Sequence, residues 1–251
     1  MRLIEASSLQ HIFFSEEGYT VALEDVSFSI EEGDFISFIG PSGCGKSTLL
    51  SIIANLIKPT SGRLTQQISP SEIGYMLQQD YLFPWKTIKE NILLGLRLQN
   101  REDTEIVDDL LRRFQLTHTA NFYPAQLSGG MRQRISLART LAVQPRLLLL
   151  DEPFSALDFY TKLLLENFVA KTIQQLEKTA ILVTHDIAEA IAMSDRVYLF
   201  SNRPGTILKV FDIPEEIRNL APFEARNSPL FQPLFQTIWK ELEANGYENV
   251  T

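Results

Sequence analysis

The chain contains four short apolar runs that do not alternate with polar residues: Phe35 to Ile39, Leu147 to Leu150, Ala180 to Val183 and Val197 to Phe200. Runs of this kind fit strands that are buried on both faces of a sheet. Longer segments with helical spacing separate the runs, and this alternation predicts a mainly parallel sheet covered by helices. The hydrophobic pattern therefore indicates an α/β fold.

The first thirty residues follow a different pattern. Residues 21–30 partly alternate between apolar and polar positions, which is typical of antiparallel edge strands. The sequence Glu31-Glu32-Gly33-Asp34 is expected to form the turn into the first buried strand. We therefore predict an antiparallel β part at the N-terminal end.

Residues 86–140 show no convincing buried strand and carry helical patterns instead. Asp103 or Thr104 is a candidate N-cap there. The helix that follows would carry four apolar residues on one face: Ile106, Leu110, Leu111 and Phe114. We interpret this region as a helical lobe inserted between elements of the sheet.

The clearest helix pattern lies near the C-terminus. Ser228 is expected to cap this helix, Pro229 to occupy its first turn, and Asn245-Gly246 to end it. One stripe of the helix is apolar: Leu230, Phe231, Leu234, Phe235, Ile238, Trp239 and Leu242. We expect the stripe to pack on its own subunit, and a contact with a second copy or a partner is the alternative.

Composition narrows the possible classes of protein. A chain of 251 residues, 45% of them hydrophobic, has the size of one domain that carries a lobe. The net charge of -8 argues against broad binding to nucleic acid, which requires clustered Lys and Arg. A single cysteine excludes an internal disulfide, and Glu5 stands where the apolar part of a signal peptide would begin, so we expect a reducing interior. No run approaches the roughly 18 apolar residues of a membrane span, so any membrane partner is a separate chain.

Residues 40–47, Gly-Pro-Ser-Gly-Cys-Gly-Lys-Ser, follow the first apolar run and precede an expected helix from Thr48 to Ile53. This is the context that a phosphate-binding loop requires. Glycines let backbone N–H groups turn toward phosphate oxygens, and the helix N-terminus adds positive potential. Lys46 would reach the terminal phosphates, and the Ser47 hydroxyl is a ligand for magnesium. A glycine-rich turn with a solvated lysine is the simpler alternative.

Asp151 and Glu152 end the second apolar run, so two carboxylates stand at the C-terminal end of a buried strand. Ligands bind at that end in open α/β sheets. Asp151 suits magnesium, and Glu152 would orient or deprotonate an attacking water. Alternatively, both acids cap the next helix. Ser128-Gly129-Gly130 precedes another helical segment and would form a second anion site, although it also fits a plain N-cap.

These motifs, read in order, make the chain resemble the ATP-binding subunit of an ATP-binding cassette (ABC) transporter over about residues 2–245. The resemblance implies a P-loop NTPase of the α/β class, with a mainly parallel sheet, an N-terminal antiparallel β subdomain and an inserted α-helical lobe. It implies one ABC ATPase domain over residues 1–245. The expected parts are an antiparallel part of about 1–30, a RecA-like core of about 30–85 and 141–210, a lobe of about 86–140, and a C-terminal helical extension of 211–251.

The resemblance also implies roles for individual residues. Glu152, His185 and Gln78 would be catalytic, and Ser47, Gln78 and Asp151 would hold Mg²⁺. An aromatic residue would stack on adenine, and counting along the first strands favours Phe13 over Phe14 and Tyr19. Ser155-Ala156-Leu157-Asp158 is similar to the loop that communicates between two copies. ATP contacts are expected from these residues: Gly40, Pro41, Ser42, Gly43, Cys44, Gly45, Lys46, Ser47, Thr48, Ser128, Gly129 and Gly130.

The resembled proteins act as pairs of ATPase chains in which Ser128, Gly129 and Gly130 of one copy would contact ATP bound by the other. The expected partners are therefore a second copy, an integral membrane permease and, indirectly, a solute-binding protein, but no nucleic acid. The expected location is the cytoplasmic side of a membrane. Three motifs resemble importers of nitrate, sulfonates such as taurine, or thiamine-pyrimidine precursors: Pro84-Trp85, the segment from Thr184 to Ala190, and Asn202-Arg203-Pro204-Gly205. We attribute these motifs to coupling with the membrane subunit. A soluble ABC ATPase that acts on DNA or ribosomes is the alternative.

Overall fold

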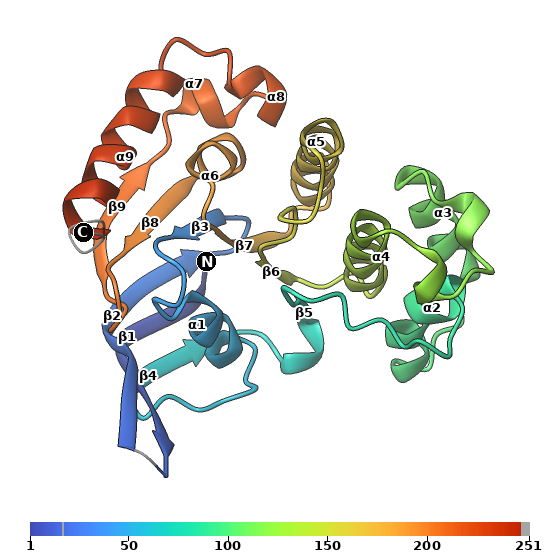
Figure 1. Cartoon of the computed structure of the whole chain (residues 1–251), viewed down its shortest axis with the longest axis horizontal. Coiled ribbons are helices and arrows are strands. Elements are labelled where there is room, and N and C mark those ends of the chain that lie inside the picture. Colours follow the sequence, from blue (N-terminus) through green and yellow to red (C-terminus); the bar gives the residue numbers. More distant parts are fainter. Residues whose placement is uncertain (17, 247–251) are drawn as a thin grey trace.

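Figure 1 shows the computed structural model of the chain, which describes residues 1–16 and 18–246. Two sheets form its body, and a group of helices extends from one side. The larger sheet has six strands in the order β5-β6-β7-β3-β8-β9. Their bounds are Phe35–Ile39 for β3, Ile73–Met76 for β5, Leu147–Asp151 for β6, Thr179–Thr184 for β7, Arg196–Phe200 for β8 and Ile207–Asp212 for β9.

All neighbouring pairs in this sheet are parallel except β8 and β9, which pair antiparallel. The four apolar runs became the four inner strands, and the P-loop NTPase fold expected from the sequence is confirmed. Two strands escaped the prediction. β5 is only four residues long, and β9 is a mostly exposed strand at the sheet edge in which Phe211 alone is buried.

The two faces of the sheet contact different cores. In β6, Leu147 and Leu149 pack in a core shared with α1 (Lys46–Ile53) and the antiparallel sheet, whereas Leu148 and Leu150 pack in the core of the helical side. Successive side chains of a strand point to opposite faces. A fully apolar run is therefore what a strand covered on both faces needs, and α5 (Phe159–Gln175) supplies part of the second cover.

The smaller sheet is antiparallel and has the order β2-β1-β4, with β1 at Arg2–Ser15 and β2 at Gly18–Glu31. Its third strand, β4 (Ser61–Gln66), lies outside the first thirty residues, where the sequence pattern places the whole antiparallel part. β4 is mostly polar and exposed, and only Leu64 contacts the core, so its pattern lacks the apolar positions that reveal a strand.

The helical lobe contains α2 (Ile88–Leu98), α3 (Thr104–Arg113) and the long α4 (Gly129–Ala142), with short 3-10 turns at Thr117–Thr119 and Pro124–Gln126. A further 3-10 turn, Pro70–Glu72, lies outside the lobe, between β4 and β5. It projects to one side of the body in Figure 1. Asp103 is the N-cap of α3, since its carboxylate accepts a hydrogen bond from the backbone N–H of Ile106 at 3.1 Å. The buried face of α3 carries Val107 and Leu111, while Ile106 is only partly buried.

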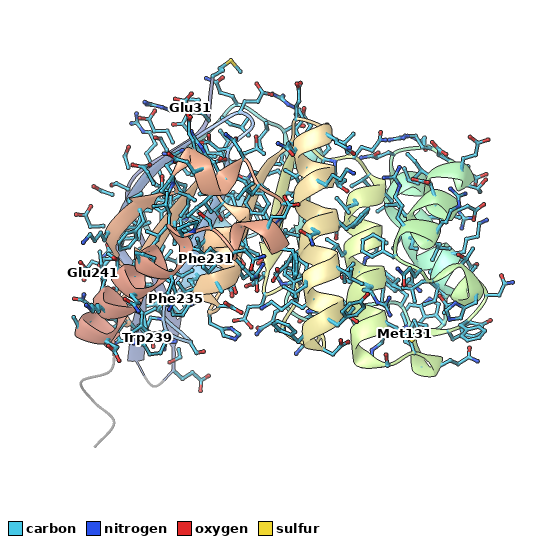
Figure 2. All side chains as sticks on the ribbon, turned by 90° about the horizontal axis from the view of Figure 1, so that it is seen from above. Glu31, Met131, Phe231, Phe235, Trp239 and Glu241 are labelled. Carbon is cyan, nitrogen blue, oxygen red and sulfur yellow. The ribbon has the colours of Figure 1, made fainter. Side chains whose placement is uncertain are left out.

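The C-terminal helices are α7 (Glu215–Arg218), α8 (Pro222–Ala225) and α9 (Phe231–Gly246), and α9 packs on α6 (Ile187–Met193). The helix start expected at Ser228 is wrong. Ser228 instead begins a turn, in which its carbonyl accepts from the N–H of Phe231, and Pro233 occupies the first turn of α9. Figure 2 shows Phe231, Phe235 and Trp239 along this helix.

The apolar stripe of α9 does pack on its own subunit, because Phe231, Ile238 and Leu242 are buried in the core beneath it. Trp239 stays 43% exposed at the edge and stacks on Phe235. Residues 247–251 of the expected C-terminal extension lie outside the described residues. Within residues 1–16 and 18–246, no helix has the length and apolar character to cross a membrane.

Candidate nucleotide-binding site

The loop between β3 and α1 is shaped by glycines at positions where no other residue fits. Gly45, the N-cap of α1, has a φ of +106°. A Cβ atom there would lie 2.6 Å from the carbonyl oxygen of Ala22 and 2.8 Å from Leu23 Cδ2. Any side chain would therefore force the loop away from β2. The tight backbone turn at the start of α1 therefore explains why glycine stands at position 45, and it also brings the loop close to β2.

Lys46 is buried in this loop. Its ammonium group donates hydrogen bonds to the carbonyl oxygens of Gly40 at 2.8 Å and Pro41 at 2.9 Å. These bonds hold a positive charge inside the loop, next to the N-terminus of α1. A helix N-terminus with free N–H groups and an adjacent ammonium is an anion site. The loop therefore has the charge and the shape to accept phosphate groups.

Asp151 ends β6 below this loop. Burial raises the pKa of its carboxyl group, and the charge of Glu152 raises it further, while Ser47 and Lys46 lower it. Burial and the charge of Asp151 also raise the pKa of Tyr75 to about 12, so these side chains form one buried polar group. Asp151 Oδ1 is buried and accepts no hydrogen bond from any described residue.

This orphaned oxygen beside the Ser47 hydroxyl fits Mg²⁺. Magnesium prefers hard oxygen ligands, and in phosphate sites it needs only one or two from the protein. Within the described residues there is no group of three or more His, Cys, Asp or Glu side chains that could hold a metal by itself. Ser47 and Asp151 are therefore suited to share the ion with a phosphate ligand.

Glu152 adopts the left-handed region, with a φ of +48°, which is uncommon for a residue other than glycine. Neighbouring groups hold its backbone there. Its N–H donates to the carbonyl of Val183 at 2.9 Å, and its own carbonyl accepts from Gln133 Nε2 at 3.1 Å and Ser155 Oγ at 3.0 Å. A strained conformation that several contacts maintain is a common feature of reactive sites.

The Glu152 side chain lies between two predicted catalytic residues. Gln78 Nε2 donates to Glu152 Oε2 at 3.0 Å, and His185 Nδ1 lies 3.4 Å from Glu152 Oε1. Gln78 follows β5 and His185 follows β7, so three strand ends deliver these groups to one point. Parallel strands that end at one edge of a sheet produce this convergence.

A cleft of about 320 Å³ opens above the loop. Phe13 and Thr20 form one wall, where they are opposed on β1 and β2. Phe13 is 46% exposed and its ring packs against His11 with centroids 4.5 Å apart. Phe14 and Tyr19 do not line this cleft. The predicted site residues that do line it are Phe13, Ser42, Gly43, Gly45, Lys46, Ser47, Thr48, Gln78 and Glu152.

The predicted site residues that do not line this cleft lie in three places: beneath it, in a smaller cavity that also includes Glu152, and at the start of α4. Gly40, Pro41, Cys44 and Asp151 lie beneath the cleft as part of the loop or of β6. His185 and Glu152 line a smaller adjoining cavity of about 130 Å³.

Ser128, Gly129 and Gly130 are not among the residues that line the cleft. They begin α4 in the helical lobe, where Ser128 Oγ accepts from the Met131 N–H at 3.3 Å. Figure 2 shows Met131 at the lobe, on the opposite side of the view from α9.

Arg203 is a cleft residue that we did not predict. Its Nε donates to the carbonyl of Gly43 at 2.9 Å. Gly205, two residues later, packs so closely on the loop that a Cβ atom there would lie 2.0 Å from the carbonyl oxygen of Cys44. The segment that we attributed to coupling with a membrane subunit thus contacts the phosphate loop. Only three-dimensional contact reveals this, because the two segments lie some 160 residues apart.

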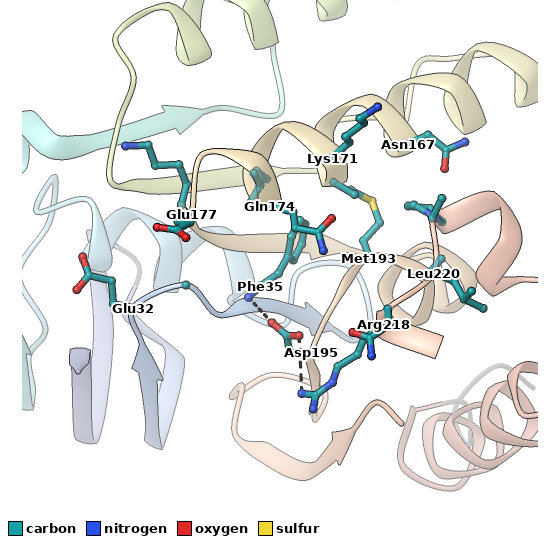
Figure 3. A pocket seen from close by; sticks show the side chains of 18 of the residues that line it. Glu32, Phe35, Asn167, Lys171, Gln174, Glu177, Met193, Asp195, Arg218 and Leu220 are labelled. Atoms are coloured by element: carbon teal, nitrogen blue, oxygen red, sulfur yellow. Dashed lines mark hydrogen bonds and ion pairs between the residues drawn. The ribbon is translucent and has the colours of Figure 1, made fainter. Parts of the chain in front are cut away.

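A larger cavity of about 860 Å³ lies elsewhere and contains none of the predicted site residues (Figure 3). Phe35, at the start of β3, is on its wall, so it opens at the end of the sheet opposite the phosphate loop. Asp195 there accepts a hydrogen bond from the Phe35 N–H at 2.7 Å and lies 3.9 Å from Arg218. Its size does not make it the reactive site, because the converging acids and the anion loop are at the other end.

The site combines a phosphate loop, the buried Asp151 beside the Ser47 hydroxyl, and Glu152, whose backbone is fixed by hydrogen bonds. Together these features define a nucleotide-hydrolysing site.

Comparison with known proteins agrees with this interpretation. Residues 23–155 match the family model described as ABC transporter. The chain is 57% identical to an uncharacterized ABC transporter ATP-binding protein, YtlC, of Bacillus subtilis, over 97% of each chain. It is 38% identical to the nitrate import ATP-binding protein NrtD of Synechocystis, over 91% of this chain and 90% of that one.

It is also 40% identical to the aliphatic sulfonates import ATP-binding protein SsuB of Bacillus licheniformis, over 89% of this chain and 88% of that one. Among solved structures, a dimeric post-hydrolysis state of the ATP-binding cassette MJ0796, bound to ADP and Pi, matches with a TM-score of 0.76 and 32% identity. That match covers 84% of this chain and 99% of the other. The chain therefore belongs to the ABC transporter family, as one of its ATP-binding, ATP-hydrolysing proteins.

Proposed function

We propose that this chain is the ATPase subunit of an importer, which closes as a pair around two ATP molecules and drives solute through a separate permease. The observation that carries the proposal is the placement of Glu152 between Gln78 and His185, at the edge of the cleft that holds Lys46. The chain provides a phosphate site and a reactive carboxylate, but it leaves the Ser128–Gly130 segment outside that cleft.

Within one chain, different residues bind the phosphates, the adenine and the metal ion, and others act on the attacking water. Lys46 and the loop N–H groups bind the phosphates, and the exposed Phe13 ring stacks on the adenine. Ser47, Asp151 and Gln78 would hold Mg²⁺, which would neutralise charge on the phosphates. Glu152 orients the attacking water and accepts its proton, and His185 faces the terminal phosphate.

The second copy supplies the missing part. Ser128, Gly129 and Gly130 begin α4, a helix of 14 residues, and its N-terminus would add positive potential to the far side of the γ-phosphate. Two helix N-termini, a lysine and a metal ion then hold the γ-phosphate, so hydrolysis removes the group that joins the copies. The relative MJ0796 forms a dimer, and its post-hydrolysis state is dimeric with ADP and Pi.

The segment after Gln78 offers a surface for the permease. Leu82 is buried under the lobe, but Tyr81 and Trp85 point outward, and Trp85 is 70% exposed. Two arginines of α4 hold this segment: Arg132 Nε donates to Asp80 Oδ2 at 2.9 Å, and Arg139 Nη2 donates to the Asp80 carbonyl at 2.7 Å. Movement of Gln78 is thereby linked to the helix that carries Ser128–Gly130.

We propose a peripheral location on the cytoplasmic side of a membrane, and a solute-binding protein as an indirect partner. Relatives named for nitrate import and aliphatic sulfonates import support a small oxyanion as cargo. Taurine, as a sulfonate, belongs to that class, and thiamine-pyrimidine precursors stay a second prediction from the sequence motifs. This ATPase chain contacts ATP, so the cargo has to be identified by transport measurements with the membrane subunit.

The first test replaces Glu152 by Gln, which keeps the side-chain size but removes the base. We expect ATP binding to persist, hydrolysis to fall by at least about a hundredfold, and a stable dimer to form with ATP in light scattering. Glu177→Gln is a matched control, since Glu177 is exposed and also has a positive φ, of +49°. A monomeric Glu152→Gln chain that hydrolyses ATP at the normal rate would contradict the assignment.

The second test concerns the permease. Trp85→Ala is expected to abolish co-purification with a co-expressed membrane subunit and to leave the basal ATPase rate unchanged. Trp239→Ala, at the exposed edge of α9, should keep the complex intact. Recovery of ribosomes or DNA with the chain, in place of a membrane protein, would overturn the transport function while leaving the ATPase activity in place.

A further inference from the structure

Five charged side chains that the proposed chemistry does not use lie together beside Glu152. This charge cluster consists of Lys162 and Glu166 on α5, Asp186 and Glu189 at the start of α6, and Arg226 just after α8. Glu166 and Glu189 are buried, and the two cations are less than one-fifth exposed. In Figure 1, α5, α6 and α8 converge on this part of the molecule.

Lys162 is the centre of the charge cluster. Its ammonium group donates to Asp186 Oδ2 at 2.7 Å and lies 2.8 Å from Glu189 Oε2 and 3.9 Å from Glu166 Oε1. Burial disfavours the charged form of Lys162, but Glu189 and Asp186 outweigh this and raise its pKa. Lys162 is therefore a charged residue that three carboxylates hold in one position.

Asp186 directly follows His185 and fixes the backbone after it. Its Oδ1 accepts from the N–H groups of Ala188 at 2.8 Å and Glu189 at 3.1 Å, which caps α6. Its Oδ2 is the oxygen that accepts from Lys162. Both oxygens are thus engaged, one by α6 and one by α5, so the residue beside His185 cannot move relative to α5 without breaking a charge-assisted hydrogen bond.

Lys162 lies in the first turn of α5, directly after the Ser155–Asp158 loop on the other side of Glu152. Asp158 caps α5 through the Thr161 N–H at 3.0 Å, and the Lys162 N–H donates to the Asp158 carbonyl at 2.9 Å. The cavity of about 130 Å³ is lined by Glu152, Ser155, Lys162, His185 and Asp186 among others, so Lys162 faces the same space as the reactive pair. Lys162 thereby contacts both segments that flank Glu152, the Asp158 turn through its backbone N–H and Asp186 through its side chain.

We propose that Lys162 is a positioning residue for ATP hydrolysis: through Asp186 it holds His185 against Glu152, and through α5 it sets this pair relative to the Ser155–Asp158 loop. The inference rests on the proposed roles of Glu152 and His185. A largely buried cluster of three acidic and two basic side chains does not stabilise a fold better than apolar packing would. This favours a role of the cluster in positioning neighbouring residues.

The test compares steady-state ATPase kinetics of the full chain. Lys162→Met keeps the length of the side chain and removes its charge. We expect kcat to fall by about tenfold to a hundredfold, since a displacement near 1 Å costs that much in a positioned site. KM for ATP should stay within about twofold, because the Lys46 loop is untouched. Lys162→Arg, which restores a cation, should return most of kcat.

Arg226→Met is the matched control. Arg226 lies 2.7 Å from Glu166 in the same charge cluster but does not contact Asp186, so its loss should lower thermal stability and leave kcat within about twofold. If Lys162→Met does not fold, Asp186→Asn replaces it. Asparagine still caps α6 but weakens the bond to Lys162, and kcat should fall by about threefold to tenfold with KM unchanged.

His185→Ala separates failure of this inference from failure of the proposed site. If His185→Ala is inactive and Lys162→Met, or Asp186→Asn in its place, retains the wild-type kcat, Lys162 does not position the switch residue. If His185→Ala has full activity, the proposed role of His185 is wrong, and the inference about Lys162 fails with it. Equal loss of kcat in Lys162→Met and Arg226→Met would reduce the charge cluster to a general stabilising role and overturn the inference.

Discussion

The contact between Gly205 and the phosphate loop gives a sharp prediction for Gly205→Ala. The backbone of Gly205 is tied to β2 on both sides: its N–H donates to the carbonyl of Ala22, and its own carbonyl accepts from the N–H of Glu24, each at 3.0 Å. The added Cβ would lie 2.0 Å from the Cys44 carbonyl oxygen, whereas ordinary contacts begin near 3.4 Å. The loop or the Arg203–Gly205 turn must therefore shift by about 1.4 Å.

The loss of stability expected for Gly205→Ala depends on which atoms collide. The obstacle is a backbone oxygen, which cannot rotate aside as a side chain can, so we expect a loss near 3 kcal/mol in the free energy of unfolding, at the upper end of overpacking effects. ATP affinity should fall by about tenfold or more, because the displaced carbonyl belongs to the residue between the loop glycines Gly43 and Gly45. Urea unfolding and calorimetric titration with ATP measure the two quantities.

Gly95→Ala is the control for adding a methyl group at a crowded glycine that does not contact the phosphate loop. A Cβ at Gly95 would meet Val143 Cγ1 at 2.5 Å, the end of a side chain in the lobe, within helix α2 where alanine is favoured. It should leave ATP affinity unchanged. If Gly205→Ala binds ATP with wild-type affinity and unfolds at the same urea concentration, the close approach of this turn to the loop is refuted.

Three further predictions concern single side chains. Lys46→Ala should lower ATP affinity by at least about tenfold, since it removes a charged hydrogen-bonding group from the loop; an equal loss in Lys171→Ala would point to a nonspecific charge effect. Arg203→Ala should raise KM for ATP by about threefold to tenfold with kcat unchanged, and an unchanged KM would show that Arg203 does not contact the nucleotide. Burial raises the pKa of Glu189 from 4.5 in the unfolded chain to about 7 in the folded protein, so the folded protein binds the proton more tightly. This protonation stabilises the fold fully below pH 4.5, and the stabilisation is lost as the pH rises through 7. Glu189→Gln should remove up to about 3 kcal/mol of the difference in unfolding free energy between pH 5 and pH 8, and an unaltered difference would disprove this origin.

The inner strands were predictable because their burial on both faces demands apolar residues at every position, as in Leu147–Leu150. β4 was not, because an exposed edge strand makes few demands on its side chains and Leu64 is its one contact with the core. The helix near the C-terminus was predictable as an element, but its start was misplaced, since Ser228 and Pro229 suit a turn as well as a cap.

The site residues also fall into two groups, those that the sequence predicts and those that only the fold reveals. Lys46, Asp151 and Glu152 stand in local motifs whose chemistry depends on neighbours in the sequence, so the pattern alone indicates them. Arg203 joins the cleft through a contact between distant segments, and Lys162 on α5 contacts both segments that flank Glu152. Neither belongs to a short motif with a chemical reason for its spacing, and only the fold brings them to the nucleotide site.

The central claim is that each ATP site is shared between two copies of the chain. It is tested most directly by mixing two inactive variants, Lys46→Ala and Gly129→Asp. Gly129 tolerates a side chain in its own subunit, because a Cβ there would meet only Arg132 Nη2, at 3.9 Å. The added carboxylate would instead repel the γ-phosphate of the ATP bound by the partner.

A mixed dimer contains one site with both defects and one site with none. Random pairing of equal amounts should therefore restore about a quarter of the wild-type ATPase rate, from half of the dimers with one intact site each. If Lys46 and Gly129 served the same ATP within one chain, every site would stay defective. A mixture without activity would contradict the shared site, and recovery near one quarter is the result that the dimer predicts.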